Sequence, residues 1–113
     1  MPRDDATLLD VMKAATQIDL FLGGMPKQAF LADAKTQSSV LYQLLVIGEA
    51  VKRLSSAFRS QHQHIPWTLI AGMRDHLIHA YDTVDWEEVW TTVTVDVPTL
   101  NSQIQPLLPR KPD

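Results

Sequence analysis

Residues 36–59 read TQSSVLYQLLVIGEAVKRLSSAFR and carry a regular apolar pattern. The main apolar positions are separated by four, three, four, three and four residues, a spacing typical of helices that pack on other helices. These positions are Val40, Leu44, Ile47, Val51, Leu54 and Phe58. The pattern predicts one long helix from Thr36 to Arg59. A second row at Leu41, Leu45 and Gly48 widens its apolar face, which indicates burial on two sides, and Gly48 would allow another backbone to approach closely.

The chain before this segment has the same helical spacing. Apolar residues three or four positions apart predict a helix from about Asp5 to Leu22. Gly23 and Gly24 should end it, because glycine adopts the left-handed conformation that closes many helices. A short segment with Phe30 should then lead into the long helix.

The chain after the long helix predicts two further helices. One runs from Pro66, a good first-turn residue, to about Tyr81. The other begins near Asp85, whose side chain can cap it, and carries an apolar stripe as far as Leu107. Pro98 lies within that stripe and should kink or break the helix. We therefore expect an all-α bundle of four to five helices, with residues 1–113 forming one domain and the proline-rich residues 106–113 frayed.

Composition excludes several classes of function. The 113 residues include no cysteine, so disulfide scaffolds, thiolate zinc sites and thiol nucleophiles are excluded. No apolar run reaches the length of about 20 residues that a membrane span needs, and the acidic start is unlike a secretory signal. The absence of cysteine permits a reducing cytoplasm, which is the location we expect. The net charge of −3 argues against a broad, sequence-independent clamp for nucleic acid, but it permits a local phosphate site.

Arg74 lies inside the apolar arc of the predicted helix over residues 66–81, where a charge is costly unless an anion meets it. Three interpretations are open. Arg74 could pair with a buried carboxylate such as Glu49, which lies within the long apolar helix. It could instead extend to the rim without a function. In the third interpretation, Arg74 and His79 line a cleft that handles a phosphate group.

Residue chemistry favours a role for His79 in the third interpretation. Histidine exchanges a proton near neutral pH, so His79 could act as a general base or acid. Asp75 lies one helical turn before His79 and could orient its imidazole, although a solvated pair at this spacing is common.

Other candidate residues have weaker support. The pair His62 and His64 resembles a metal motif but has no nearby acidic partners, so we interpret it as loop polarity and expect no metal site. His76 lies toward the apolar side of the helical wheel, which predicts a packed core histidine. The three tryptophans are better explained as core or interface anchors than as base-stacking platforms: Trp67, Trp86 and Trp90.

Arg74, His79 and Tyr81 together form the pattern R-x4-H-x-Y. With the segments around it, this pattern resembles the HEPN-domain toxins of the HepT kind. The resemblance covers nearly the whole chain in order, through residues 30–44, 47–54, 70–75, 84–90 and 97–100. It is therefore far more specific than the short pattern alone.

The resemblance implies an all-α homodimer in which two such segments face each other across a cleft. It also implies a metal-independent endoribonuclease without a cofactor, the toxin of a toxin–antitoxin pair. Arg74 and His79 match the catalytic positions, and Asp75 matches a supporting polar position less strongly. The implied partner is an antitoxin of the MntA kind with a nucleotidyltransferase fold, which silences the nuclease by transferring AMP onto Tyr81.

Two other functions remain open from the sequence. The chain could be a non-catalytic helical binding module that docks and regulates a nucleotidyltransferase, which the acidic charge and the lack of a basic RNA track would favour. It could also, with less support, be a nucleotide-binding helper. RNA cleavage by the purified chain would separate the lead function from both.

Overall fold

The computed structural model describes residues 2–109, and all regular elements in that range are helical. Helix α1 spans Pro2–Leu22 and the short α2 spans Lys27–Leu31. Helix α3 spans Ala34–Lys52, followed by α4 at Ser56–Gln61 and α5 at Trp67–His79. Helix α6 at Trp86–Thr91 continues through a π-helical segment at Thr92–Asp96 into α7 at Val97–Ile104, and 3₁₀ turns lie at Tyr81–Thr83 and Gln105–Leu107. The all-α class is confirmed.

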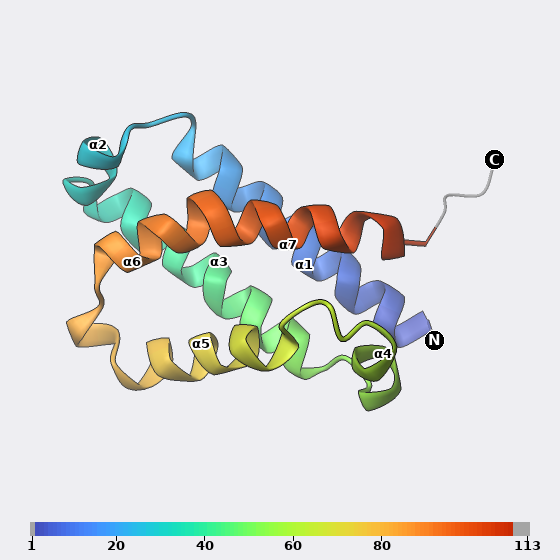
Figure 1. Cartoon of the computed structure of the whole chain (residues 1–113). Helices are drawn as coiled ribbons and strands as arrows, with labels where there is room; N and C mark the ends of the chain where they lie inside the picture. The colour runs from blue at the N-terminus through green and yellow to red at the C-terminus, as the bar shows by residue number, and fades with distance from the viewer. Residues whose placement is uncertain (1, 110–113) are drawn as a thin grey trace.

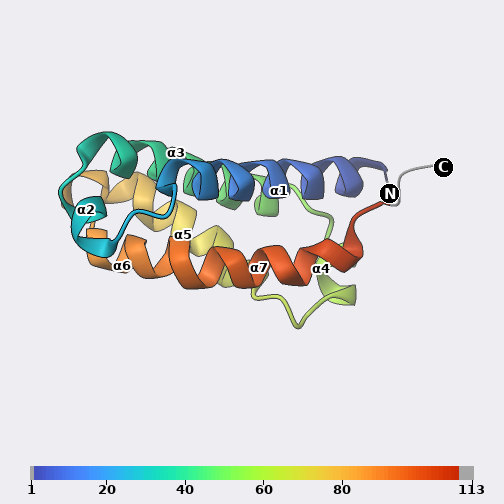
Figure 2. The ribbon, with the colours of Figure 1, turned by 90° about the horizontal axis from the view of Figure 1, so that it is seen from above.

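Helix α3 is the central element of the fold. It packs against α1 on one side and against α5 on the other, while α7 covers α1. Figures 1 and 2 show α1 and α3 side by side, with the continuous α6–α7 rod crossing over them. The molecule measures 42 × 34 × 20 Å, and its smallest extent equals about two helix diameters. The fold therefore has two layers.

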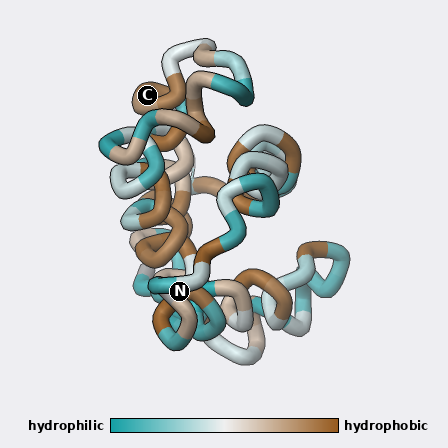
Figure 3. The backbone as a smooth tube through the Cα atoms, turned by 90° about the vertical axis from the view of Figure 1, so that its left-hand side faces the viewer, coloured by the Kyte–Doolittle hydropathy of each residue, from teal (hydrophilic) through white to brown (hydrophobic). Residues whose placement is uncertain are grey.

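The apolar stripes predicted from the sequence form the core. The stripe of α3 is buried from Val40 through Val51, with Leu54 buried just beyond the helix, and that of α1 is buried at Leu8, Val11 and Ile18. Figure 3 shows hydrophobic and hydrophilic residues recurring in turn along the long helices. Phe30 of α2 is fully buried and packs against Trp86 and Trp90, which confirms two of the tryptophans as packing anchors. The third, Trp67, is also buried.

The predicted helix over Thr36–Arg59 is interrupted, and this expectation was wrong. Helix α3 ends at Lys52, and Ser55 caps the separate helix α4 by accepting a hydrogen bond from the Phe58 N–H at 3.1 Å. Ser55 also donates its own N–H and its hydroxyl to the Asp4 carboxylate, at 2.9 and 2.7 Å. Apolar spacing continues across the break, but the local cap at Phe58 and the two bonds to the distant Asp4 hold the backbone of Ser55 outside a helix.

The glycine and proline expectations have clear outcomes. Gly23 and Gly24 end α1 with φ values of 51° and 77°, as predicted. Asp85 caps α6 through the N–H groups of Glu87 and Glu88. The missing N–H of Pro98 is accommodated by the π-helical segment immediately before α7, so the helix widens there rather than breaking. Pro106 and Leu107 form a 3₁₀ turn, and the remainder of the predicted frayed tail, from residue 110, lies outside the described residues.

Within residues 2–109, no helix combines the length and the apolar character that crossing a membrane requires.

Candidate functional site

Arg74 lies where α5 crosses α3, directly over Gly48. A Cβ atom built on Gly48 would overlap the Cβ of Arg74 and would lie 3.3 Å from its Cα. Any residue larger than glycine would therefore push the two helices apart at this point. The close approach predicted for Gly48 is confirmed. This contact fixes the distance between α3 and α5 at Arg74.

The Arg74 guanidinium is shared between two carboxylates. Its Nη2 lies 2.9 Å from Oε2 of Glu49 on α3, and its Nη1 lies 2.9 Å from Oδ1 of Asp75 on α5. The Arg74 side chain is 25% exposed, whereas those of Glu49 and Asp75 are each 48% exposed. The pairing with Glu49 considered from the sequence is therefore present, but the expectation that this carboxylate is buried was wrong. The pair lies at the surface and not in the core, so a diffusing anion can reach the guanidinium.

Asp75 joins the two helices a second time. Its Oδ1 also accepts a hydrogen bond from Nζ of Lys52 on α3 at 3.0 Å. The Lys52 ammonium and, to a smaller extent, the Arg74 guanidinium hold the pKa of Asp75 below its ordinary value of 3.8. Asp75 thus faces the cations of this cluster, and the structure gives no hydrogen bond between Asp75 and His79 among the described side chains.

A shallow hollow of about 270 Å³ opens beside this cluster. Arg74 and Glu49 line it together with Arg53 and three apolar side chains, which are Leu45, Val46 and Ile78. With Lys52, the cluster contains three basic and two acidic groups, so it retains one positive charge. Lys52 and Arg53 were not singled out from the sequence. Lys52 and Arg53 follow Gly48 and Glu49 by four residues each, so the spacing within one helix predicts that they lie near those positions.

His79 is the last residue of α5 and is exposed. Five residues along an α-helix correspond to a rotation of about 140°, so His79 and Arg74 point in different directions from α5. Among the described residues, no hydrogen bond or ion pair involves the His79 imidazole. A single chain therefore does not bring the two predicted catalytic groups together.

Tyr81 lies beyond the end of α5. The helix closes at Ala80, and Tyr81 begins a 3₁₀ turn over Tyr81–Thr83. The predicted helix to about Tyr81 therefore ends two residues earlier than expected. The Ala80 N–H bonds the His76 carbonyl, and the chain then turns toward Asp85, which caps the next helix. The Tyr81 side chain lies outside the described part of the structure.

The remaining histidines have simple structural surroundings. His76 is exposed on α5, so the prediction of a packed core histidine was wrong: it occupies the boundary of the apolar arc, on the side that faces solvent. The His62 ring lies 4.5 Å from the Phe58 ring and 6.1 Å from that of His64. Within residues 2–109, the structure contains no group of three or more histidine, aspartate or glutamate side chains placed to hold a metal ion.

The all-α class agrees with the sequence comparisons. The profile of the family described as Ribonuclease HepT-like matches residues 11–107. The chain belongs to this family, the HepT-like ribonucleases.

Curated proteins similar to the chain carry related names. A protein of Thermococcus cleftensis named "Probable ribonuclease HepT" is 41% identical over 100 residues, which cover 88% of this chain and 91% of that protein. A "Putative RNase" of Caldanaerobacter subterraneus is 38% identical, over 78% of this chain and 79% of its own length. Another "Putative RNase", from Methanocaldococcus jannaschii, is 37% identical over 96% of this chain and 91% of its own. No solved structure matches the chain significantly.

Proposed function

We propose that the chain is a metal-independent endoribonuclease, the toxin of a toxin–antitoxin pair, in which Arg74 and His79 act at the interface of a homodimer. The observation that carries the proposal is the position of Arg74: its guanidinium lies at the α3–α5 crossing, 25% exposed, on the rim of a hollow with a net positive charge. Family membership and the names of the related proteins support RNA as the substrate.

A second copy would supply what one chain lacks. Because Arg74 and His79 point about 140° apart on α5, the face between them contains Ile78 and Asp75. Ile78, which lines the hollow with Arg74, is 40% exposed. Large apolar groups exposed beside a charged cluster are typical of interfaces. A second copy packed against this face would bring its own Arg74 and His79 to the dimer interface, which is called the seam below.

RNA cleavage at such a seam needs two proton transfers and neutralisation of phosphate charge. In the proposed reaction, His79 takes the proton from the ribose 2′-hydroxyl, and the 2′-oxygen forms a bond to phosphorus. The bond from phosphorus to the 5′-oxygen breaks, and the protonated His79 of the second copy gives its proton to that leaving oxygen. Arg74 stabilises the charge that develops on the phosphate oxygens. For this, the phosphate must take over one edge of the guanidinium from Glu49 or Asp75.

Regulation by AMP transfer is the second part of the proposal. A nucleotidyltransferase antitoxin of the MntA kind would join the phosphorus of AMP to the Tyr81 oxygen and release pyrophosphate from ATP. The R-x4-H-x-Y pattern supports this assignment, as does the turn over Tyr81–Thr83, which begins two residues after His79. A bulky anion there would block access to the seam and pair with its cations. Because RNA is the proposed substrate, the proposed site of action is the cytoplasm.

The direct test is incubation of the purified chain with structured RNA in the presence and absence of EDTA. The proposal predicts cleavage in both, with products that end in a 2′,3′-cyclic phosphate or its hydrolysis product. Cleavage abolished by EDTA would contradict metal independence. Intact mass of the chain co-expressed with the neighbouring gene product tests the partner, through AMP additions that map to Tyr81.

The alternative is a non-catalytic helical module that docks and regulates a nucleotidyltransferase. One observation favours it: both edges of the Arg74 guanidinium are already occupied by carboxylates. The absence of RNA cleavage at micromolar protein, combined with a stable complex with the nucleotidyltransferase, would select this function over the nuclease.

A further inference from the structure

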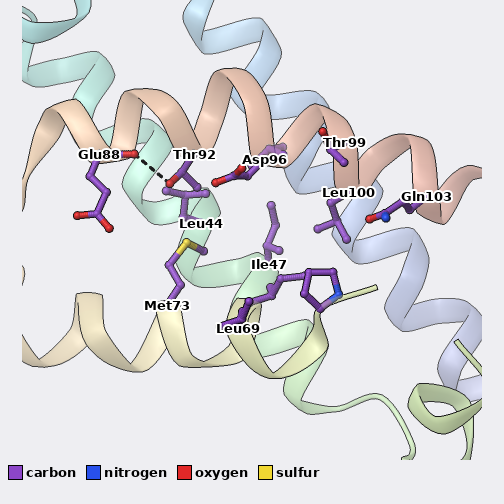
Figure 4. A pocket seen from close by; sticks show the side chains of 13 residues that line it. Leu44, Ile47, Leu69, Met73, Glu88, Thr92, Asp96, Thr99, Leu100 and Gln103 are labelled. Atoms are coloured by element: carbon purple, nitrogen blue, oxygen red, sulfur yellow. Dashed lines mark hydrogen bonds between the residues drawn. The ribbon is translucent and has the colours of Figure 1, made fainter. Parts of the chain in front are cut away.

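An apolar groove lies on the opposite side of α5 from the Arg74 hollow. It has a volume of about 450 Å³ and separates α5 from the α6–α7 rod, with Leu44 and Ile47 of α3 forming its floor. Figure 4 shows these floor residues between the two walls. Neither Arg74 nor His79 lines this groove. It is therefore distinct from the proposed nuclease site.

The two walls of the groove differ in chemistry. The α5 wall is apolar and carries Met73 and Leu69, of which Leu69 is 75% exposed at the lip. The opposite wall carries the carboxylates Glu88 and Asp96, with Thr92 between them. Figure 4 shows the Glu88 side chain extending from α6 toward α5. The lining contains no lysine, arginine or histidine, so its charge is entirely acidic.

The π-helical segment belongs to the acidic wall. Thr92 and Asp96 are its first and last residues, and both line the groove. Single π-helical turns within α-helices occur often at functional sites, because the widened turn redirects the side chains. Here it holds the exposed Asp96 at the groove edge while Val93 and Val97 stay buried in the core. In the described part of the chain, neither Glu88 nor Asp96 takes part in an ion pair.

We propose that this groove docks an amphipathic helix of a partner protein, with an apolar face on Leu69 and Met73 and basic side chains on Glu88 and Asp96. Charge complementarity selects this occupant. A purely apolar ligand that covered the groove would remove water from both carboxylates and offer them no partner. A leucine with most of its surface exposed beside a methionine is typical of surfaces that receive an apolar helix face.

The geometry specifies the occupant further. Glu88 and Asp96 are eight positions apart, which would be about 12 Å along an α-helix and is less here because Thr92–Asp96 is π-helical. A helix lying parallel to the α6–α7 rod would meet both carboxylates with lysine or arginine residues seven or eight positions apart. Its apolar residues, at spacings of three and four, would enter the groove on the α5 side.

The test uses a fluorescein-labelled helical peptide with a leucine stripe and two lysines eight positions apart, titrated with the full chain by fluorescence anisotropy. We expect a dissociation constant in the micromolar range. Leu69→Glu and the double change Glu88→Lys/Asp96→Lys should each weaken binding about tenfold or more, as losing a central anchor residue or a charge pair does. A peptide with glutamates in place of the lysines should bind the double variant and not the original chain.

Matched controls separate the groove from general surface effects. Leu20→Glu changes a leucine that is 65% exposed on α1, and Asp10→Lys/Asp19→Lys reverses two exposed charges on the same helix. Both should leave peptide binding unchanged, and circular dichroism should show that every variant is folded. Equal weakening by the control variants, or no binding to the original chain, would overturn the proposal. Conversion of a dimer to a monomer by Leu69→Glu would also overturn it, since the groove would then receive a second copy of the chain.

Discussion

Arg74 and Gly48 occupy one shared space: the Cβ of Arg74 takes the place that a side chain on Gly48 would need. This contact joins the packing of the fold to the candidate site, because the α3–α5 distance at Gly48 determines whether the Arg74 guanidinium reaches Glu49. A substitution that changes the α3–α5 distance therefore also changes the ion pair between Arg74 and Glu49.

Gly48→Ala should destabilise the protein and displace α5. The added methyl group overlaps Arg74, and overpacking of this kind costs about 1–3 kcal/mol. Gly72→Ala is the matched control, because a Cβ there meets no atom within 4 Å, and alanine in a helix interior is more stable than glycine by about 0.5–1 kcal/mol. Urea unfolding at equilibrium measures both. Equal gains in stability for the two variants would show that the helices do not approach so closely in solution.

Arg74→Ala and His79→Ala should abolish RNA cleavage with little effect on folding. The loss of charge stabilisation or of proton transfer reduces such reactions by about 10²-fold or more. Stability should change by no more than about 1–2 kcal/mol, because His79 is exposed and the pair of Arg74 with Glu49 lies at the surface. Arg3→Ala and His76→Ala, which change exposed residues, are the controls. Unfolding of both site variants would show that the residues are structural.

Glu49→Gln should lower the KM for RNA several-fold and leave kcat nearly unchanged. The glutamine amide oxygen can still accept the hydrogen bond from Arg74 Nη2, but the negative charge that competes with phosphate is removed. Glu49→Ala, which removes the acceptor as well, should lower kcat because the guanidinium is then held only by Asp75. Steady-state kinetics on a short RNA separates the two effects. An increase in KM for Glu49→Gln would contradict competition between the carboxylate and phosphate.

Ile78→Glu should reduce both dimer formation and RNA cleavage. The substitution introduces a charge into the apolar face that lies between Arg74 and His79, and desolvating an unpaired charge opposes association. Val95→Glu is the control, because Val95 is 55% exposed on the π-helical segment, away from this face. Sedimentation velocity gives the oligomeric state, and the same samples give the activity. An unchanged dimer with Ile78→Glu would require a different interface.

Acid should weaken the attachment of α1 to the start of α4. The two hydrogen bonds from Ser55, above all that from its backbone N–H, lower the pKa of the Asp4 carboxyl from its ordinary value of 3.8. The folded state therefore binds this proton less readily than the unfolded state, so the stabilisation is complete above the unfolded pKa and is lost as the pH falls through the lower folded pKa.

Asp4→Asn tests this linkage. It should lower the free energy of unfolding near neutral pH by about 1–3 kcal/mol, the contribution of hydrogen bonds to a charged group. The difference from the original chain should shrink in strong acid, where Asp4 is protonated. Asp10→Asn, at an exposed position of the same helix, should have little effect. Urea unfolding at several pH values between neutral and strongly acid measures the difference, and a constant difference across that range would contradict the assignment to Asp4.

Much of the fold was predictable because it depends on patterns within single helices. The buried faces of α1 and α3, the glycine end of α1 and the Asp85 cap all follow from spacing and local hydrogen bonding. The break before α4 was not predictable, because it depends on Asp4, which lies 51 residues away in the chain. Spacing also extended α5 to about Tyr81, whereas the helix ends at His79 and Tyr81 begins a 3₁₀ turn.

The sequence by itself determined the helical class, the core stripes and the small set of polar residues that could form a site, because these depend on residue type and on a period of three to four positions. Only the tertiary structure decided which charges meet. Arg74 pairs with Glu49 because α5 crosses α3 at a glycine, and Asp75 bonds Lys52 of α3, a partner that no spacing within α5 indicates. Contacts between helices depend on their crossing point and rotation, and no single-helix pattern encodes either quantity.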